Sequence, residues 1–136
     1  MGRRSGGGGL SEAITEGVRV RVDARYHGDR SNPGASYWFF AYTVSITNLG
    51  DETVQLLSRH WVITDANAHV EHVRGPGVVG QQPVLQPGET FEYTSACPLP
   101  TSLGSMHGTY EMARENGDRF DAEIAPFSLA DPDSLH

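Results

Sequence analysis

The chain contains no lysine, and arginine supplies all ten of its basic side chains. With 17 Asp and Glu residues its net charge is -7 and its pI about 5.2. This balance argues against a general affinity for nucleic acid or for anionic membrane surfaces. Cysteine occurs once, at Cys97, so the chain forms neither an internal disulfide nor a cysteine zinc cluster. A lone cysteine is typical of a reducing compartment, and the expected location is the cytoplasm.

Long apolar runs are also missing. None approaches the ~20 residues that a membrane-spanning helix needs, so no membrane insertion is expected. The first residues, two arginines followed by serine and four glycines, lack the apolar stretch of a signal peptide. Residues 1–10 are therefore predicted to be a flexible glycine-rich tail, either native or a cloning remnant. Residues 11–130 are predicted to form one domain, and residues 131–136 a short C-terminal tail.

An alternation of apolar and polar residues predicts strands along most of the chain, and no segment has a convincing amphipathic-helix pattern. The alternation is clearest over residues 18–26, and residues 37–47 are rich in the aromatic and β-branched side chains that strands favour. Further extended segments are predicted at 53–64, 69–73, 83–85, 90–96, 106–114 and 120–124. Asn116-Gly117 favours a tight type I′ hairpin. Seven to eight short strands separated by turns indicate an all-β sandwich or barrel.

The strand at 53–64 has apolar residues on both faces. Strict alternation places Leu56 with Val62 on one face, and Leu57, Trp61 and Ile63 on the other. The pattern predicts a bent strand.

Three glycines, Gly75, Gly77 and Gly80, have the Gly-x-Gly-x-x-Gly spacing of dinucleotide-binding loops. That chemistry requires a helix directly after the loop, and Pro83 and Pro87 prevent one from starting. Two interpretations remain. In the first, the glycines form a tight connection between sheets, where a positive φ or a close backbone approach excludes side chains.

In the second interpretation the loop binds a phosphate-containing ligand. Backbone N–H groups would form a nest around the anion, with Arg74 and Arg59 supplying positive charge. The candidate ligand-binding residues are then Arg59, Arg74, Gly75, Gly77 and Gly80. Pro76 removes one N–H donor from this arrangement.

No combination of residues predicts catalysis. Cys97, followed by proline, is interpreted as a small buried residue. The histidines and acids around the 66–68 turn, together with His60, offer a possible metal site through His60, His69, Glu71 or His72. A solvated hairpin is the preferred interpretation, because no His-x-His pair places two imidazoles side by side. The expectation is no enzyme activity, no bound metal and no cofactor.

Several short segments, taken in order, match the pattern of a known family: Tyr42–Gly50, Gln55–Asp65, Gly75–Gly80, Gln82–Pro83, Leu85–Glu89, Phe91–Ser95, Gly104–Met112 and Pro126–Leu129. Through these segments the sequence resembles, over residues 16–129, the ApaG family, which occurs as a small bacterial protein and as a domain of some eukaryotic proteins. Small departures occur at Ala68, where the family usually has a hairpin glycine, at His72, usually acidic, and at Ala96, often glycine.

The resemblance implies an immunoglobulin-like sandwich of the fibronectin type III kind, which agrees with the strand count. It implies no established enzyme activity. It links the family to cobalt resistance and magnesium efflux in bacteria, and its occurrence in eukaryotic F-box and polymerase-interacting proteins implies a protein partner. The expected function is thus a non-enzymatic protein-interaction module associated with divalent-cation homeostasis. The alternative is a sensor of phosphate, pyrophosphate or nucleotide at residues 75–80.

Overall fold

The fold was determined as a computed structural model, which describes residues 9–135 of the chain. The predicted N-terminal tail therefore lies almost entirely outside the described residues. Three short 3₁₀ turns accompany the strands, η1 (Gly28–Arg30), η2 (Pro33–Ala35) and η3 (Pro132–Leu135). The strands are β1 (Leu10–Thr15), β2 (Val18–Tyr26), β3 (Trp38–Asn48), β4 (Val54–Asp65), β5 (Val70–Pro76), β6 (Val84–Leu85), β7 (Thr90–Leu99), β8 (Leu103–Arg114) and β9 (Arg119–Ala130).

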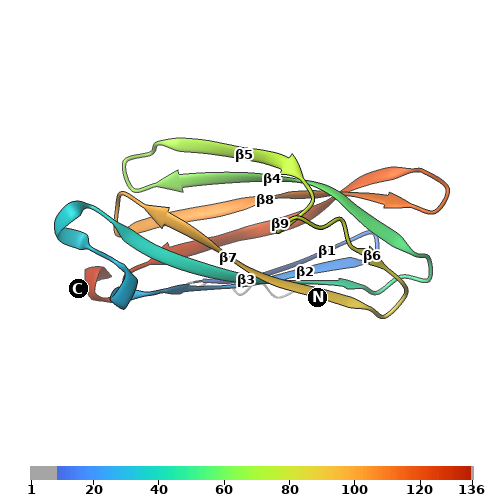
Figure 1. Cartoon of the computed structure of the whole chain (residues 1–136), viewed down its shortest axis with the longest axis horizontal. Helices are drawn as coiled ribbons and strands as arrows, with labels where there is room; N and C mark the ends of the chain where they lie inside the picture. Colours follow the sequence, from blue (N-terminus) through green and yellow to red (C-terminus); the bar gives the residue numbers. More distant parts are fainter. Residues whose placement is uncertain (1–8, 136) are drawn as a thin grey trace.

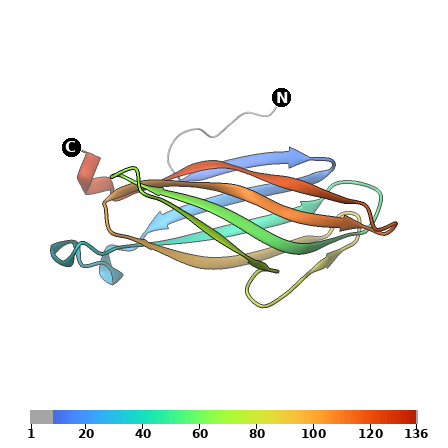
Figure 2. The same cartoon turned by 90° about the horizontal axis from the view of Figure 1, so that it is seen from above.

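Two antiparallel sheets form a sandwich, as predicted (Figure 1). The first sheet has the order β1-β2-β3-β7, and the second has the order β5-β4-β8-β9, with the two-residue β6 also paired to β4. On one side β9 packs against β1 and β2, which closes the sandwich there (Figure 2). On the other side lie the edge strands β5 and β7, and neither pairs with a further strand in the described part of the chain. This side of the sandwich is open.

The core lies between the sheets and consists of the inward residues of each alternating strand. Val18, Val20 and Val22 of β2 are almost completely buried, as the period-two pattern predicts. Trp61 stands at the centre, with edge-to-face contacts to Tyr42, at 5.2 Å between ring centroids, and to Tyr110, at 6.2 Å. Each fully buried large apolar side chain contributes about 1.5–3 kcal/mol relative to exposure, so the alternation fixes which face of each strand points inward.

Strand β1 has no counterpart among the predicted strands. Two of its apolar residues, Leu10 and Ile14, are exposed, so its sequence shows no clear alternation. It forms because β2 offers it a complete antiparallel partner, from Leu10 opposite Asp23 to Thr15 opposite Val18. Tertiary pairing, and not local sequence, defines this strand.

A β-bulge at Leu57 explains the apolar residues on both faces of β4. Leu56 pairs with Met112 and Ser58 with Glu111, so Leu57 is an extra residue in the ladder. The bulge shifts the alternation by one residue, and Leu56 and Trp61 both become buried on the inner face. The assignment of these two residues to opposite faces is therefore wrong, because strict alternation fails at a bulge.

The β8–β9 turn also differs from its prediction. Arg114 N–H donates to Asp118 O at 2.8 Å and Gly117 N–H to Arg114 O at 2.9 Å, and of the turn residues only Gly117 has a positive φ, of 91°. This is a three-residue loop with a left-handed third residue, and not a type I′ turn. The β4–β5 turn repeats the pattern, with Ala68 at φ 64° in the position that corresponds to Gly117.

Candidate functional site

The three glycines lie where β5 ends and turns toward β6. Both strands pair with β4, so the loop joins two segments of one sheet, and the interpretation of a connection between sheets is wrong. Each glycine has its own physical role. Gly77 has φ 61°, and a Cβ there would lie 2.2 Å from the carbonyl oxygen of Gln81. Gly80 has open space around it, so a side chain would not clash there; glycine is favoured only because the tight Val78–Gln81 turn requires a positive φ, of 79°, at this position. Gly75 has no positive φ; its missing side chain leaves room for the Arg59 guanidinium, whose Nη2 would lie 3.0 Å from a Cβ at this position.

Three backbone N–H groups of this loop are already used by the chain itself. Gly77 N–H donates to Leu57 O, Val78 N–H to Gln81 O, and Gln81 N–H to Val78 O, each at 2.8 Å. These donors point into neighbouring backbone and do not face solvent. Any anion bound here would therefore depend on side chains more than on a backbone nest.

The Arg59 side chain points into the sandwich. Its partner in the β4–β5 ladder is Gly75, and its partner in the β4–β8 ladder is the buried Tyr110. Nη1 of Arg59 donates to the carbonyl oxygens of Pro76, at 3.0 Å, and Gly77, at 2.9 Å. These two bonds hold the glycine loop against the β4 strand.

Arg74 lies on the opposite face of the same sheet. It pairs with His60 on β4, next to the Arg59–Gly75 pair. Because successive side chains alternate between faces, the Arg74 side chain points away from the interior of the sandwich, and it is exposed. The structure thus brings together Arg59, Gly75, Gly77 and Gly80, whereas the Arg74 side chain belongs to the other face of the sheet. On that face, residues Arg74, Arg59 and Gly75 line a separate hollow of about 300 Å³.

A groove runs along the open side of the sandwich, between β5 and β7. We call it the Arg59 groove. It has a volume of about 390 Å³ and is lined by Tyr42, Arg59, Trp61, Ile63, Glu71, Val73, Ser95, Ala96, Cys97, Pro98 and Met106. A second hollow of about 250 Å³, formed with Val78, Val79, Gly80 and Tyr93, shares Tyr42, Arg59, Trp61 and Ser95 with it. The two hollows are therefore neighbours that meet at Arg59, beside the glycine loop.

Three buried tyrosines surround the guanidinium. Burial raises the pKa of Tyr42, and the Ser95 side chain and the Arg59 charge oppose this rise. Burial likewise raises the pKa of Tyr93 and of Tyr110, whose hydroxyls hydrogen-bond to each other, and the Arg59 charge again acts in the opposite direction. At neutral pH all three hydroxyls are protonated and able to donate hydrogen bonds.

Cys97 lies on the inner face of β7, opposite Phe40. Burial, followed by the negative charge of Glu71, raises the pKa of its thiol to about 11. Because the thiolate is the reactive form, this cysteine is a poor nucleophile at neutral pH. It serves as a small apolar wall of the groove, in line with the interpretation from the sequence.

The proposed metal candidates separate into two faces. His60 and His72 stack on the outer face, with 2.9 Å between Nε2 of His60 and Nδ1 of His72. Glu71 points to the inner face, since it pairs with Ile63. Desolvation and the nearby charges of Arg74, His72 and His107 lower the pKa of His60, while Asp121 opposes the shift. Within residues 9–135 no three His, Cys, Asp or Glu side chains are grouped so that they could hold a metal ion.

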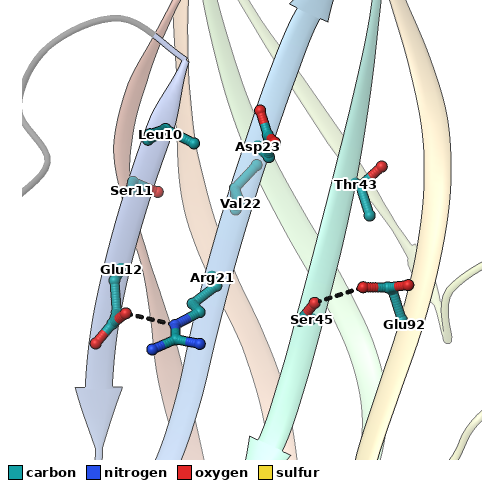
Figure 3. Close-up of a pocket in the computed structure, with 9 residues that line it drawn as sticks. All are labelled: Leu10, Ser11, Glu12, Arg21, Val22, Asp23, Thr43, Ser45 and Glu92. Atoms are coloured by element: carbon teal, nitrogen blue, oxygen red, sulfur yellow. Dashed lines mark hydrogen bonds and ion pairs between the residues drawn. The ribbon is translucent and has the colours of Figure 1, made fainter.

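A larger hollow of about 540 Å³ lies on the outer face of the first sheet (Figure 3). Four of its polar side chains form two pairs: Arg21 Nε donates to Glu12 at 2.6 Å, and the Ser45 hydroxyl donates to Glu92 at 2.9 Å. Because these groups already have partners, the hollow offers a ligand less than the Arg59 groove does.

Sequence reasoning found Arg59 but missed Tyr42, Glu71 and Ser95 as its neighbours. A signal for Ser95 was present, since it is a polar residue between the inward Tyr93 and Cys97. Glu71 gave no such signal, because the pairing of β5 with β4 alone decides which face it occupies.

The fold and groove define a class: a small antiparallel β-sandwich of the immunoglobulin-like, fibronectin type III-like kind, with one open side. The sequence pattern of the ApaG domain matches residues 28–114. The chain belongs to the ApaG domain family.

Relatives of this family are similar in sequence over most of the chain. Protein ApaG of Bordetella pertussis is 56% identical over 119 residues, which are 88% of this chain and 91% of the relative. Protein ApaG of Anaeromyxobacter dehalogenans is 54% identical over 127 residues, 93% of this chain and 100% of the relative.

A solved structure shares the fold. The crystal structure of the putative ApaA protein from Bordetella pertussis is 54% identical and covers 89% of this chain and 95% of its own, with a TM-score of 0.82. Within residues 9–135 no helix has the length and apolar character needed to cross a membrane.

Proposed function

We propose that this chain is a non-enzymatic, cytoplasmic binding module, and that a protein partner engages the open side of the sandwich. One observation carries the proposal: two edge strands, β5 and β7, flank a groove whose walls come from both sheets. Edge strands offer unpaired backbone N–H and C=O groups to an added strand, and alternate side-chain pockets give such binding its specificity. The protonated state of Cys97 supports the non-enzymatic part of the proposal.

Site-specific photo-crosslinking tests this function. A photoreactive residue replaces Val73, which faces the groove from β5, and in a control it replaces Val62, which lies on the outer face of β4 opposite His72. We expect a discrete crosslinked partner from bacterial extract with the Val73 probe, competed away by unmodified protein. The same products from both positions would contradict a groove-directed interaction.

We further propose that this partner acts in divalent-cation homeostasis, and the support is the link to cobalt resistance and magnesium efflux that the family resemblance implies. Complementation of a bacterial strain that lacks its own ApaG protein tests this part. Wild type and a Val62→Trp control are expected to restore growth on cobalt, whereas Val73→Trp, which fills the groove, is expected to fail. Full complementation by the Val73→Trp protein would refute a role for the groove in this process.

The second candidate function is a sensor of phosphate, pyrophosphate or nucleotide beside the 75–80 loop. The observation that favours it is the Arg59 guanidinium seated on Gly75. Calorimetric titration with pyrophosphate tests it: saturable heat that disappears in Arg59→Met is expected. The absence of heat at millimolar ligand would remove the idea.

A further inference from the structure

Arg59 is a charged residue on the inner face of a sheet, and a bulge puts it there. Without the extra residue Leu57, Arg59 would share the outer face with the surface residues of β4. Bulges of this kind commonly re-aim a side chain next to a functional site. The bulge delivers a guanidinium to the wall of a groove that is otherwise lined mainly by apolar and aromatic residues.

The guanidinium forms no ion pair with Glu71, although the Glu71 carboxylate lines the same groove. Of the four ion pairs formed within residues 9–135, none involves Arg59. Its two hydrogen bonds to the backbone both come from Nη1. An arginine has five N–H donors, so those of Nε and Nη2 remain for another acceptor. Partly buried charges are normally paired, and an anion in the groove would supply the missing partner.

Hydroxyl groups and apolar walls complete the site. Tyr42 and Ser95, which face each other across the β3–β7 ladder, line both hollows together with Arg59. Ile63 and Val73 are only partly buried and form an apolar wall of the groove, and Val73 pairs with Trp61 across the β4–β5 ladder. A volume of about 390 Å³ falls within the ~300–1,000 Å³ typical of small-molecule sites.

We propose that the Arg59 groove binds a small organic carboxylate with a flat apolar body. The carboxylate accepts hydrogen bonds from the Arg59 guanidinium and from the hydroxyls of Ser95 and Tyr42. The apolar body lies along Val73 and Ile63, toward Cys97. This site shares Arg59 with the phosphate candidate beside the 75–80 loop. It differs from that candidate in its other donors, the hydroxyls of Ser95 and Tyr42, and in its apolar wall. The proposal does not depend on a protein partner, so it stands or falls separately from the proposed function.

The test is an NMR titration with 2-naphthoate, which follows the indole N–H resonance of Trp61 after assignment with a Trp38→Phe variant. Naphthalene-2-methanol provides the same rings without the charge, and acetate provides the charge without the rings. Saturable shifts are expected with 2-naphthoate, and at least about tenfold weaker binding with either analogue, since a charge-assisted hydrogen bond and apolar burial each contribute about that much. Pyrophosphate carries charge without an apolar body and is expected to bind at least about tenfold more weakly than 2-naphthoate; equal or tighter binding of pyrophosphate would favour the phosphate candidate and overturn the proposal.

Two arginine variants of the same hairpin give a matched comparison. Arg59→Met is expected to weaken 2-naphthoate binding by about tenfold or more, and Arg74→Met, on the other face, by less than about twofold. Because Arg59→Met also removes the bonds to the glycine loop, a third variant, Val73→Trp, blocks the groove and keeps Arg59; it is expected to abolish binding. Equal effects of the two arginine variants, unchanged binding in Val73→Trp, or no saturable shift with 2-naphthoate would overturn the proposal.

Discussion

Replacing Ala68 with glycine is expected to stabilise the protein. Ala68 has φ 64° in the β4–β5 turn, where its N–H donates to Asp65 O at 3.1 Å. A left-handed conformation costs a non-glycine residue about 1–2 kcal/mol, because Cβ approaches the following carbonyl oxygen. Glycine removes that cost but adds about 0.5–1 kcal/mol of unfolded-state entropy. The balance is a gain of about 0.5–1 kcal/mol, or about 2–4 °C in Tm for a domain of this size.

The β8–β9 turn provides the reverse experiment. Gly117 has φ 91° in the same type of loop, and a Cβ there would meet nothing within 4 Å. Gly117→Ala is therefore expected to lose about 0.5–1 kcal/mol through conformation alone, without a steric clash. Urea and thermal unfolding of both variants measure the two changes.

A control within the first turn separates conformation from general loop flexibility. Ala66 is exposed in the same turn and does not have a positive φ. Ala66→Gly should only add unfolded-state entropy, so a small loss of stability is expected. A loss of stability in Ala68→Gly, or an equal gain in Ala66→Gly, would refute the argument from backbone conformation.

Three further predictions concern the glycine loop and the groove. Gly77→Ala is expected to destabilise the fold by about 2 kcal/mol or more, and Gly80→Ala by about 1 kcal/mol. The reason is that both glycines have a positive φ, but only at Gly77 would a Cβ also lie 2.2 Å from a carbonyl oxygen. Equal losses of stability in urea unfolding would contradict this. Val79→Asn is expected to raise the free energy of unfolding by up to about 1 kcal/mol. Val79 is exposed, has φ 42° and occupies the first central position of a type I′ turn, where asparagine is favoured. A lower Tm of this variant would argue against backbone strain at Val79. The free energy of unfolding is expected to fall as pH rises from 9.0 to about 11, because the unfolded chain releases the Cys97 proton in this window and the folded chain keeps it. In urea unfolding, Cys97→Ala should show a smaller fall in stability over this pH range. The same pH dependence in Cys97→Ala as in the wild type would refute the raised pKa of Cys97.

The alternation of apolar and polar residues predicted the positions of the main strands of the sandwich. Strand β2 has the bounds expected from its valines and arginines, and β3 differs from its prediction by one residue at each end. These strands have one buried and one exposed face, so the sequence carries their period directly. The glycine and proline positions also correctly excluded a helix after Gly80, because proline lacks the N–H that a helix needs.

The bulge at Leu57 could not be predicted from the alternation of apolar and polar residues. Nothing in the residues around it distinguishes an extra ladder residue from ordinary alternation, and the pairing with Met112 and Glu111 on β8 decides the matter. The same limit applies to β1, which exists because β2 pairs with it, and to the turn at residues 114–118, where the dipeptide Asn116-Gly117 is compatible with two loop lengths.

The sequence by itself determined an all-β chain, the phase of most of its strands and the ApaG resemblance, because these depend on local periodicity and on the order of short motifs. Only the tertiary structure decided that Arg59 faces inward and Arg74 outward, and that Arg59 lies beside Tyr42 and Ser95. The physical reason is that strand register and bulges arise from pairing between distant segments, and one added residue reverses the face of every side chain that follows it.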